Sequence, residues 1–432
     1  MEYQTLGATG LREHQFELLE RYQRFKAEKL NLDMSRGKPC PEQLDLSLGL
    51  ITCLTKDDYK TLDGTDCRNY GGVDGIPEAR ELLAPILDVD PEEVIVSGNS
   101  SLTLMYDLIV RGLLLGVPGG STPWGKQPKV KFLCPSPGYD RHFAICNQLG
   151  IEMVTLELGE TGPDMDQVER LVAEDESIKG IWCVPKYCNP TGTTYSDEVV
   201  DRLAKMKAKA PDFRIFWDNA YAVHHLNERP DHLKNIFQAC KVAGNPDRVL
   251  LFSSTSKISF AGAGLSVMAG SENNINWLKK QVIIQTIGPD KLNQLRHVRF
   301  FKNFAGIESQ MKKHAAIIKP KFDQVLTTLE TELGGKNIAT WTKPNGGYFI
   351  SLNTLEGCAK KVVKMAAEAG VVLTGAGATY PYGNDPLDRN IRIAPTFPAL
   401  AELKKAMEIV AVCVQLASLE KVLGEEKNVA NL

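Results

Sequence analysis

The chain turns from apolar to polar within one short segment, Leu251-Phe252-Ser253-Ser254-Thr255-Ser256-Lys257, which ends on a single lysine. The small residues Ala261-Gly262-Ala263-Gly264 follow closely. A lysine at the end of a buried strand is badly placed for a surface charge. It is well placed as a nucleophile, because partial desolvation of the ammonium populates the neutral amine. The segment alone also fits a solvated lysine in a turn, so the rest of the chain has to decide.

Between residues 90 and 270, short apolar runs alternate with longer helical patterns. The apolar runs are 94–96, 130–134, 181–184, 213–217, 249–252 and 265–269, and helical stretches include 101–115 and 197–209. Alternation of this kind is typical of βαβ units. We therefore expect an α/β fold with a mostly parallel sheet and helices on both of its faces.

Five of these runs are followed at once by a polar or glycine-rich cluster. The clusters occupy residues 97–101, 135–139, 185–192, 218–221 and 253–257. In open α/β sheets, ligands bind outside the carboxyl ends of the strands. The five clusters are therefore predicted to form one site.

Two of the strand ends supply polar groups that suit a heteroaromatic ligand. Asp218 follows the apolar run 213–217, and a carboxylate buried there needs a partner such as a pyridinium N–H. Tyr221 and Asn189, the latter in Asn189-Pro190-Thr191-Gly192, could both donate to a phenolate oxygen. Ordinary roles stay open at this point, because Asp218 also fits a helix N-cap and Asn-Pro-x-Gly is a common turn sequence.

Three further positions suit an anion, a planar ring and a carboxylate. The turn Ser97-Gly98-Asn99-Ser100-Ser101 precedes a helix, whose free N–H groups and dipole favour an anion, although plain capping also fits. Tyr139 suits stacking on a planar cofactor or a simple place in a loop. Arg392, in Asn390-Ile391-Arg392-Ile393-Ala394, suits bidentate capture of a carboxylate or a surface ion pair.

Composition narrows the class of protein. The chain has 432 residues, 43% of them apolar and 24% charged, and a formal net charge of −3. This balance leaves no basic footprint for nucleic acid or for an anionic membrane. The ten cysteines occur without CxxC pairs, which indicates a reducing compartment. Because no apolar stretch is long enough for a bilayer and Met1-Glu2-Tyr3-Gln4 is unlike a signal peptide, we expect a cytoplasmic protein.

The chain resembles the fold-type I pyridoxal-phosphate aminotransferases over nearly its whole length. The resemblance rests on several motifs in the family's order, each of them weak alone. They are Tyr70 ahead of Gly75, the turn Ser97–Ser101, Tyr139, Asn189-Pro190-Thr191-Gly192, Asp218-x-x-Tyr221, Ser254-x-Ser256-Lys257 and Arg392. Within the superfamily, the chain is most similar to the bacterial aspartate aminotransferase-like group whose domain is labelled MocR-like.

The resemblance implies that pyridoxal 5′-phosphate is the cofactor and assigns residues around its ring. Lys257 would bind the cofactor covalently and move a proton between the substrate α-carbon and the cofactor. Asp218 would pair with the pyridine nitrogen, and Asn189 and Tyr221 would hydrogen-bond the ring oxygen. Tyr139 would stack on the ring. Lys257, Asp218 and Tyr221 are thus the expected catalytic residues.

The resemblance also implies the phosphate and substrate contacts. Ser100, Ser101 and Ser254 would hold the phosphate, with Tyr70 contributed by the neighbouring subunit of a homodimer with shared active sites. Arg392 would bind the α-carboxylate of the substrate. We therefore expect the partners to be small amino and 2-oxo acids and a second copy of the chain, with no nucleic acid and no membrane.

One position departs from the family pattern. Many relatives carry an arginine eight residues after the lysine, directed at the cofactor phosphate, and here that position is Leu265. The phosphate charge must then be balanced by backbone N–H groups, hydroxyls and any other basic residue nearby.

The domain organisation expected from length and resemblance has two parts. An N-terminal segment, 1–50, packs with a small C-terminal α+β domain, 296–432, and residues 51–295 form the large domain that binds pyridoxal phosphate. Residues 277–320 are predicted to form a long helix or a broken pair of helices that ends before Pro320.

The expected reaction is transamination of L-aspartate with 2-oxoglutarate, which gives oxaloacetate and L-glutamate. The aspartate assignment rests on the subgroup resemblance. A dicarboxylic substrate needs a second cation, for which Arg36, in Ser35-Arg36-Gly37-Lys38, and Arg141 are candidates, and Asn189 is also expected at the substrate.

Other functions remain open on the sequence. They are an aminotransferase for alanine or aromatic amino acids, a β-lyase or decarboxylase with the same cofactor, and a non-enzymatic effector-sensing domain. Zinc chemistry finds little support, because His224 and His225 are adjacent and do not face one ligand sphere, and we expect no metal. No G-x-G-x-x-G follows the first strand, which argues against a nicotinamide cofactor.

Overall fold

The computed structural model describes residue 3 and residues 7–430, and it divides the chain into two units. The large unit comprises Pro41–Cys188 and Thr193–Ala315, and the small unit comprises Met1–Cys40, Asn189–Gly192 and Ala316–Leu432. The predicted division into 1–50, 51–295 and 296–432 stays a prediction, and its residues 1–2, 4–6 and 431–432 lie outside the described residues.

The large unit is built on one eight-stranded sheet in the order β2-β9-β8-β7-β6-β3-β4-β5. Neighbouring strands from β8 to β4 are parallel, whereas β9 runs antiparallel to both β2 and β8, and β5 runs antiparallel to β4. The strands are β2 Val94–Ser97, β3 Lys131–Ser136, β4 Glu152–Gly159, β5 Gly162–Pro163, β6 Ile178–Cys183, β7 Arg214–Asp218, β8 Val249–Ser254 and β9 Ser266–Ala269. The predicted α/β class with a mostly parallel sheet is confirmed.

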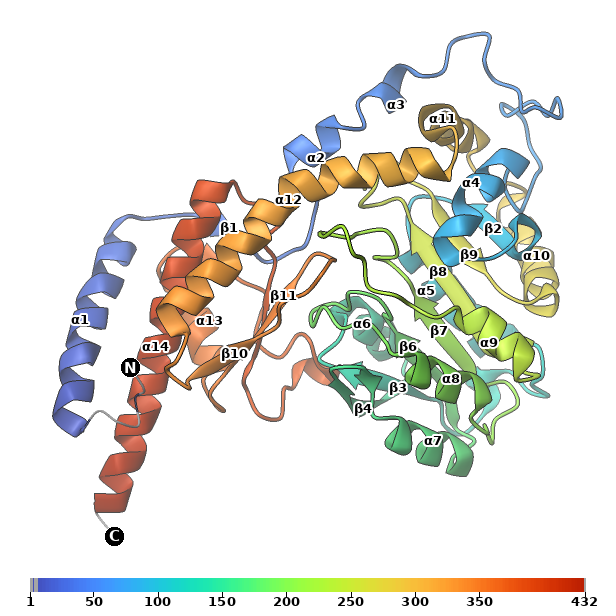
Figure 1. Cartoon of the computed structure of the whole chain (residues 1–432). Helices are drawn as coiled ribbons and strands as arrows, with labels where there is room; N and C mark the ends of the chain where they lie inside the picture. Colours follow the sequence, from blue (N-terminus) through green and yellow to red (C-terminus); the bar gives the residue numbers. More distant parts are fainter. Residues whose placement is uncertain (1–2, 4–6, 431–432) are drawn as a thin grey trace. The chain divides into compact units, whose positions relative to one another are not determined.

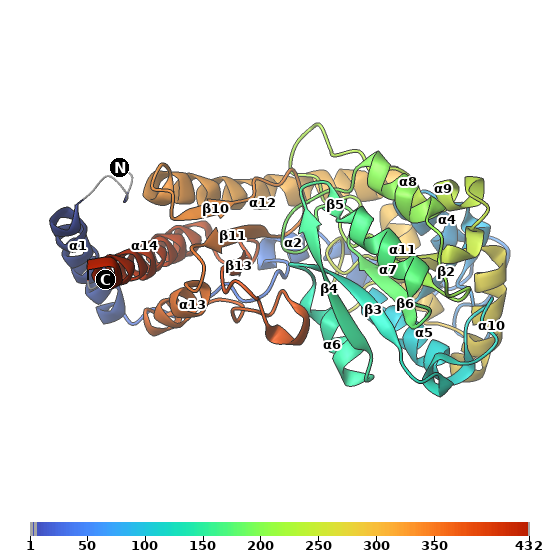
Figure 2. The same cartoon turned by 90° about the horizontal axis from the view of Figure 1, so that it is seen from below.

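Helices cover both faces of this sheet. Figure 2 shows α7 and α8 on one side of the strands and α5 and α6 on the other. The helices of the large unit are α2 Pro41–Asp45, α3 Gly49–Thr52, α4 Pro77–Leu87, α5 Ser101–Leu115, α6 Asp140–Gln148, α7 Met165–Glu174, α8 Asp197–Lys205, α9 Ile236–Val242, α10 Glu272–Thr286 and α11 Lys291–Phe301. The helix predicted over 101–115 is confirmed in α5.

The central strands are mostly apolar because both of their faces are covered, and the charged residues within β6 and β7 are Lys179, Arg214 and Asp218. Every residue of β6 and β7 is buried. The ring of Phe216 lies 5.4 Å from that of Phe132 and 5.0 Å from that of Trp182, and it stacks on Phe252 at 5.9 Å between ring centres. The packing of these rings holds the strands in place relative to one another. It therefore also fixes the positions of the polar residues at their carboxyl ends.

The small unit contains a three-stranded antiparallel sheet with helices around it (Figure 1). The strand order is β10-β11-β13, and β1 pairs separately with β12. Its elements are α1 Ala8–Ala27, β1 Leu32–Asp33, β10 Ala339–Trp341, β11 Ile350–Thr354, α13 Ala359–Glu368, β12 Val371–Val372, β13 Asn390–Ile393 and α14 Leu400–Ala430.

The predicted end of a helix before Pro320 is wrong. The helix α12 runs from Phe304 to Leu333 with Pro320 inside it. A proline in a helix interior removes one hydrogen bond and costs about 3 kcal/mol. Buried apolar residues continue on one face beyond the proline, and each contributes about 1.5–3 kcal/mol, so their burial outweighs that cost. These residues are Phe322, Val325 and Leu329.

Two further findings concern the solvent and redox environment. No helix in residues 7–430 is long and apolar enough to cross a bilayer. The ten cysteines all carry free thiols, and only Cys53 is not fully buried.

Candidate active site

Lys257 lies in a turn directly after β8, as the sequence predicts for a residue at a strand end. Its Nζ atom lies 5.4 Å from the centre of the Tyr221 ring, which is itself buried. Burial lowers the pKa of the Lys257 ammonium below its usual value, and the negative charge of Asp218 opposes this shift. The net direction favours a neutral, nucleophilic amine.

Asp218 is the last residue of β7 and is 2% exposed. One carboxylate oxygen, Oδ2, lies 3.0 Å from Nε2 of His142, which donates to an ionised carboxylate. The other oxygen, Oδ1, is buried and has no hydrogen-bond partner among the described residues. Because an unpaired buried carboxylate oxygen is costly, this atom suits an N–H donor of a bound ligand.

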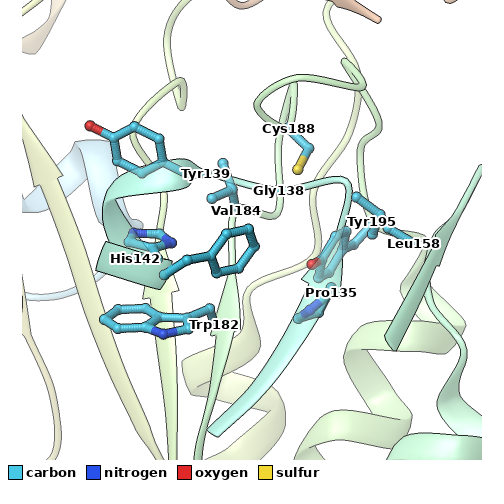
Figure 3. A pocket seen from close by; sticks show the side chains of 10 residues that line it. Pro135, Gly138, Tyr139, His142, Leu158, Trp182, Val184, Cys188 and Tyr195 are labelled. Carbon is cyan, nitrogen blue, oxygen red and sulfur yellow. The ribbon is translucent and has the colours of Figure 1, made fainter. Parts of the chain in front are cut away.

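His142 was not predicted from the sequence, and it organises the surroundings of Asp218. The imidazole stacks on the indole of Trp182, with 4.1 Å between ring centres and 8° between planes. Tyr139 meets the same imidazole edge-on at 4.9 Å. Figure 3 shows the three rings in successive layers, with His142 in the middle. The available signal was the three-residue spacing from Tyr139, which places both side chains on one side of the first turn of α6.

A cavity of about 10 Å³ lies beside these rings. It is lined by residues that include Gly138, Cys188 and Tyr195, which surround it in Figure 3. A space of this size holds at most one water molecule, so it is a packing void behind Tyr139.

The serine-rich turn predicted to bind an anion connects β2 to α5. Ser100 is the residue before α5, and its side chain makes no capping hydrogen bond. Ser101 is the first residue of this 15-residue helix. Both are half-buried. The hydroxyl of Ser100 and the first N–H groups of α5 are thus available to an anion at a helix N-terminus.

This anion turn is joined to the turn that carries Lys257. The Ser256 hydroxyl donates to the backbone oxygen of Asn99 at 3.0 Å, and the Ser266 N–H donates to that of Gly98 at 2.6 Å. The Ser254 hydroxyl donates to Ser256 Oγ at 3.0 Å. The predicted phosphate residues and the lysine are therefore held in one hydrogen-bonded assembly.

Leu265, at the position where the family resemblance predicts an arginine, is 1% exposed. Its N–H donates to Thr255 Oγ1 at 2.8 Å, and its carbonyl accepts from the Thr255 N–H at 2.7 Å. The position closes the lysine turn with its backbone and fills the core with its side chain.

Tyr70 is 82% exposed on a loop of the large unit. A buried lysine that sequence reasoning did not single out, Lys291, holds this loop. Its Nζ atom donates to the backbone oxygens of Asn69 at 2.6 Å and Gly71 at 2.7 Å. These two bonds fix the backbone on either side of Tyr70.

Arg392, on β13, lies in the small unit with Asn189 and Arg36. Its Nη1 donates to Asn189 Oδ1 at 3.3 Å, its Nη2 donates to Thr374 Oγ1 at 3.2 Å, and its guanidinium lies over the Phe349 ring at 5.0 Å. Arg392 is 5% exposed. A buried guanidinium fixed by these hydrogen bonds and by a ring holds its planar fork in one orientation, and this geometry suits a carboxylate.

Arg36 is exposed, and its loop is tied to the Arg392 group. The Thr374 hydroxyl donates to the backbone oxygen of Ser35 at 2.6 Å. A Cβ atom on Gly37 would come within 2.4 Å of the Phe349 ring, so only glycine allows this close packing.

Comparisons with known proteins place the chain in a family. The family described as aspartate aminotransferase matches residues 6–426. A relative from Mycolicibacterium smegmatis that is named as an aminotransferase is 50% identical over 429 residues, which cover 99% of this chain and 100% of the relative. An aspartate aminotransferase from Corynebacterium glutamicum is 46% identical over 404 residues, 94% of this chain and 93% of that protein.

A solved structure agrees with the sequence comparisons. The crystal structure of an aspartate transaminase from Corynebacterium glutamicum superposes with a TM-score of 0.95 at 44% identity, over 98% of this chain and 99% of that one. The chain belongs to the aspartate aminotransferase family, and the predicted fold-type I class and aminotransferase activity are confirmed.

The opposition between burial and Asp218 gives a test of the site that needs no bound ligand. Asp218→Asn removes the negative charge that raises the Lys257 pKa, so this pKa should fall further. In cofactor-free protein, the pH at which Lys257 becomes half-reactive toward an amine reagent, followed by mass spectrometry, should therefore decrease. The matched control Asp201→Asn, which removes a carboxylate paired with Lys234, should leave this pH unchanged. A rise in the variant would contradict the assigned electrostatics.

Proposed function

We propose that the enzyme transfers the amino group of L-aspartate to 2-oxoglutarate with pyridoxal 5′-phosphate bound covalently to Lys257. The observation that carries the cofactor assignment is the buried Oδ1 atom of Asp218, which lacks a partner among the described residues. The substrate assignment is supported by the relatives of 46% and 44% identity that are named for aspartate.

The residues present fit this cofactor. Pyridoxal phosphate, when bound, supplies an electron sink that stabilises negative charge at the substrate α-carbon. Asp218 Oδ1 would accept the pyridine N–H, while His142 holds the other oxygen and so orients the carboxylate. Tyr139 provides a ring face for stacking, and Tyr221 and Asn189 supply donors for the ring oxygen.

The phosphate group is assigned to the turn between β2 and α5. Ser100, Ser101 and Ser254 offer hydroxyls, and the start of α5 offers N–H groups and the positive end of the helix dipole. This arrangement would bind the phosphate dianion without an arginine at position 265.

Lys257 then acts twice. Its neutral amine would hold the cofactor covalently, and with substrate bound the same amine would accept the proton from the substrate α-carbon and donate it again. The lowered Lys257 pKa suits both steps, because the amine must accept a proton near neutral pH and give it up again.

Arg392 is assigned to the α-carboxylate that all amino acids share. Asn189 and Thr374 hold the guanidinium, and the Phe349 ring supports it, which keeps the fork in one orientation. Arg36 is assigned to the distal carboxylate of aspartate and 2-oxoglutarate. It is exposed, charged and joined to the Arg392 group through Ser35.

A homodimer with shared active sites is part of the proposal. Tyr70 is exposed but held in place, which suits a side chain that serves the phosphate of a second copy of the chain. The large unit also exposes apolar side chains near the ends of α5 and α10, which are linked by Arg111 and Gln285. These exposed residues are Leu114, Leu115, Ile283, Ile284 and Ile287. The cytoplasmic location expected from the sequence stays a prediction.

The covalent assignment is tested by chemical trapping. Purified protein should be yellow, and borohydride reduction followed by peptide mass spectrometry should find the cofactor on Lys257. The Lys257→Ala variant should carry no reduced adduct. An adduct on another lysine, or no adduct in the wild type, would contradict covalent attachment of the cofactor to Lys257.

The role of Arg392 is tested with substrates of different side chain. Arg392→Ala should lower kcat/KM by at least roughly 100-fold for every amino acid that reacts, because each loses the partner of its α-carboxylate. The measurement is the half-reaction that converts the pyridoxal form to the pyridoxamine form, followed by absorbance. A loss restricted to aspartate would move Arg392 to the distal carboxylate.

The role of Arg36 is tested by the same half-reaction with aspartate and alanine. Arg36→Ala should lower kcat/KM for aspartate by roughly 5-fold and leave that for alanine nearly unchanged, since an exposed charge contributes only about 1 kcal/mol. Arg141→Ala, which removes the other candidate cation, is the matched control. Equal effects of Arg36→Ala on both amino acids would remove it as the distal contact.

A further inference from the structure

The turn that carries Lys257 is closed by its own backbone and then anchored to α11. The Ile258 and Ser259 N–H groups donate to the Thr255 oxygen at 2.9 and 2.8 Å. This turn places Lys257 midway between Thr255 and Ser259, so the positions of these two residues determine where the amine lies.

The anchor on α11 is His297, which is fully buried. Its Nδ1 atom lies 2.8 Å from the backbone oxygen of Asn293, four residues earlier on the same helix. A carbonyl oxygen only accepts, so Nδ1 carries the proton. Burial lowers the pKa of His297 to about 4, and the ring is neutral at physiological pH. Its Nε2 atom is therefore an acceptor.

This tautomer orients a chain of hydroxyl groups. The Ser259 hydroxyl lies 2.9 Å from His297 Nε2 and donates its one proton there. Ser259 Oγ lies 3.0 Å from Thr255 Oγ1. Because the one hydroxyl proton of Ser259 is directed at His297, Thr255 is the donor between these two hydroxyls. Thr255 Oγ1 in turn accepts from the Leu265 N–H at 2.8 Å. All the hydrogen bonds in this series therefore point the same way, from the Leu265 N–H to His297 Nε2.

The same helix holds the other end of the loop. The side-chain amide of Asn293 donates to the backbone oxygens of Ala263 at 3.2 Å and Gly264 at 3.0 Å. One face of α11 therefore fixes both the turn before Lys257 and the segment that returns to β9.

We propose that His297, acting through Ser259 and Thr255, is a positioning residue that sets the location of the Lys257 amine for proton transfer. The inference rests on the proposed function, because it names what holds the proton-transferring lysine in place. His297 acts only through other residues and is not itself a catalytic group.

Two conservative variants distinguish the roles of the two ring nitrogens of His297. In His297→Asn, the short amide can replace Nδ1 and its bond to Asn293, but it cannot reach the Nε2 position. In His297→Gln, the longer side chain can place its oxygen at the Nε2 position and accept from Ser259. A role limited to helix stability predicts that the Asn variant is the better replacement, and a role in positioning Lys257 predicts the Gln variant.

The expected result is that His297→Asn lowers kcat by roughly 10- to 100-fold with little change in KM, and that His297→Gln restores most of this loss. The primary isotope effect with α-deuterated aspartate should increase in the Asn variant, because proton transfer becomes more rate-limiting. Ser259→Ala, which removes the central hydroxyl, should reproduce the Asn variant. His232→Asn, at an exposed histidine, should match the wild type in all measurements.

A second readout uses cofactor-free protein. In His297→Asn and Ser259→Ala, amide hydrogen exchange in a peptide spanning residues 255–266 should be faster than in the wild type and in His297→Gln, since the Leu265 N–H loses its fixed acceptor. The full chain is used throughout, and circular dichroism confirms that each variant is folded.

Equal kcat values, isotope effects and exchange rates in the Asn and Gln variants would overturn the proposal. Failure of the proposed function looks different. In that case the wild type shows no half-reaction with any amino acid, while the exchange measurements still report whether the hydroxyl chain holds the turn. Slower turnover with an unchanged isotope effect in His297→Asn would also contradict a role in proton transfer.

Discussion

The buried carboxylate of Asp218 is the constraint on which the candidate active site depends. Taking this group out of water is costly unless both of its oxygens are paired. His142 pairs one oxygen, and the indole of Trp182 stacks on the His142 ring and fixes its orientation. The second oxygen, Oδ1, has no partner among the described residues, so its desolvation penalty remains until a ligand donates a hydrogen bond to it. The fold therefore favours a ligand that presents an N–H group to Asp218. The negative charge of Asp218 also raises the pKa of the Lys257 amine and so opposes the lowering caused by burial.

The fold and the strand-end residues were predictable because a covered parallel sheet leaves a simple pattern. Strands buried on both faces are mostly apolar, and polar residues at or shortly after their carboxyl ends lie on the edge of the sheet where ligands bind. Lys257 and Asp218 follow this rule. The strand β4, Glu152–Gly159, was not predicted, because its inner residues are buried in alternation and several of its outer residues are exposed. The prediction that the helix ends before Pro320 considered only the local cost of a proline inside a helix. The packing that offsets this cost in α12 is visible only in the tertiary structure.

The supporting residues of the site were not predictable for a related reason. His142 and His297 act through contacts with residues 76 and 38 positions away, and no local period encodes such distances. A single sequence does not show whether a histidine inside a helix is buried or exposed, or which residues it contacts. Burial decides the matter, because it lowers the pKa of His297 and leaves one nitrogen as a permanent acceptor.

In the proposed assignment, a leucine at position 265 leaves phosphate binding to the geometry of the turn between β2 and α5, without a guanidinium charge from that position. A helix N-terminus carries only about half a unit of positive charge, so it compensates a dianion less than a guanidinium does. Its N–H groups must then be held accurately, because they contribute through direction and distance. The bonds from Ser256 to Asn99 and from Ser266 to Gly98 provide this accuracy. They couple the anion turn to the lysine turn, so one assembly would set the distance between the two ends of the cofactor in the proposed complex.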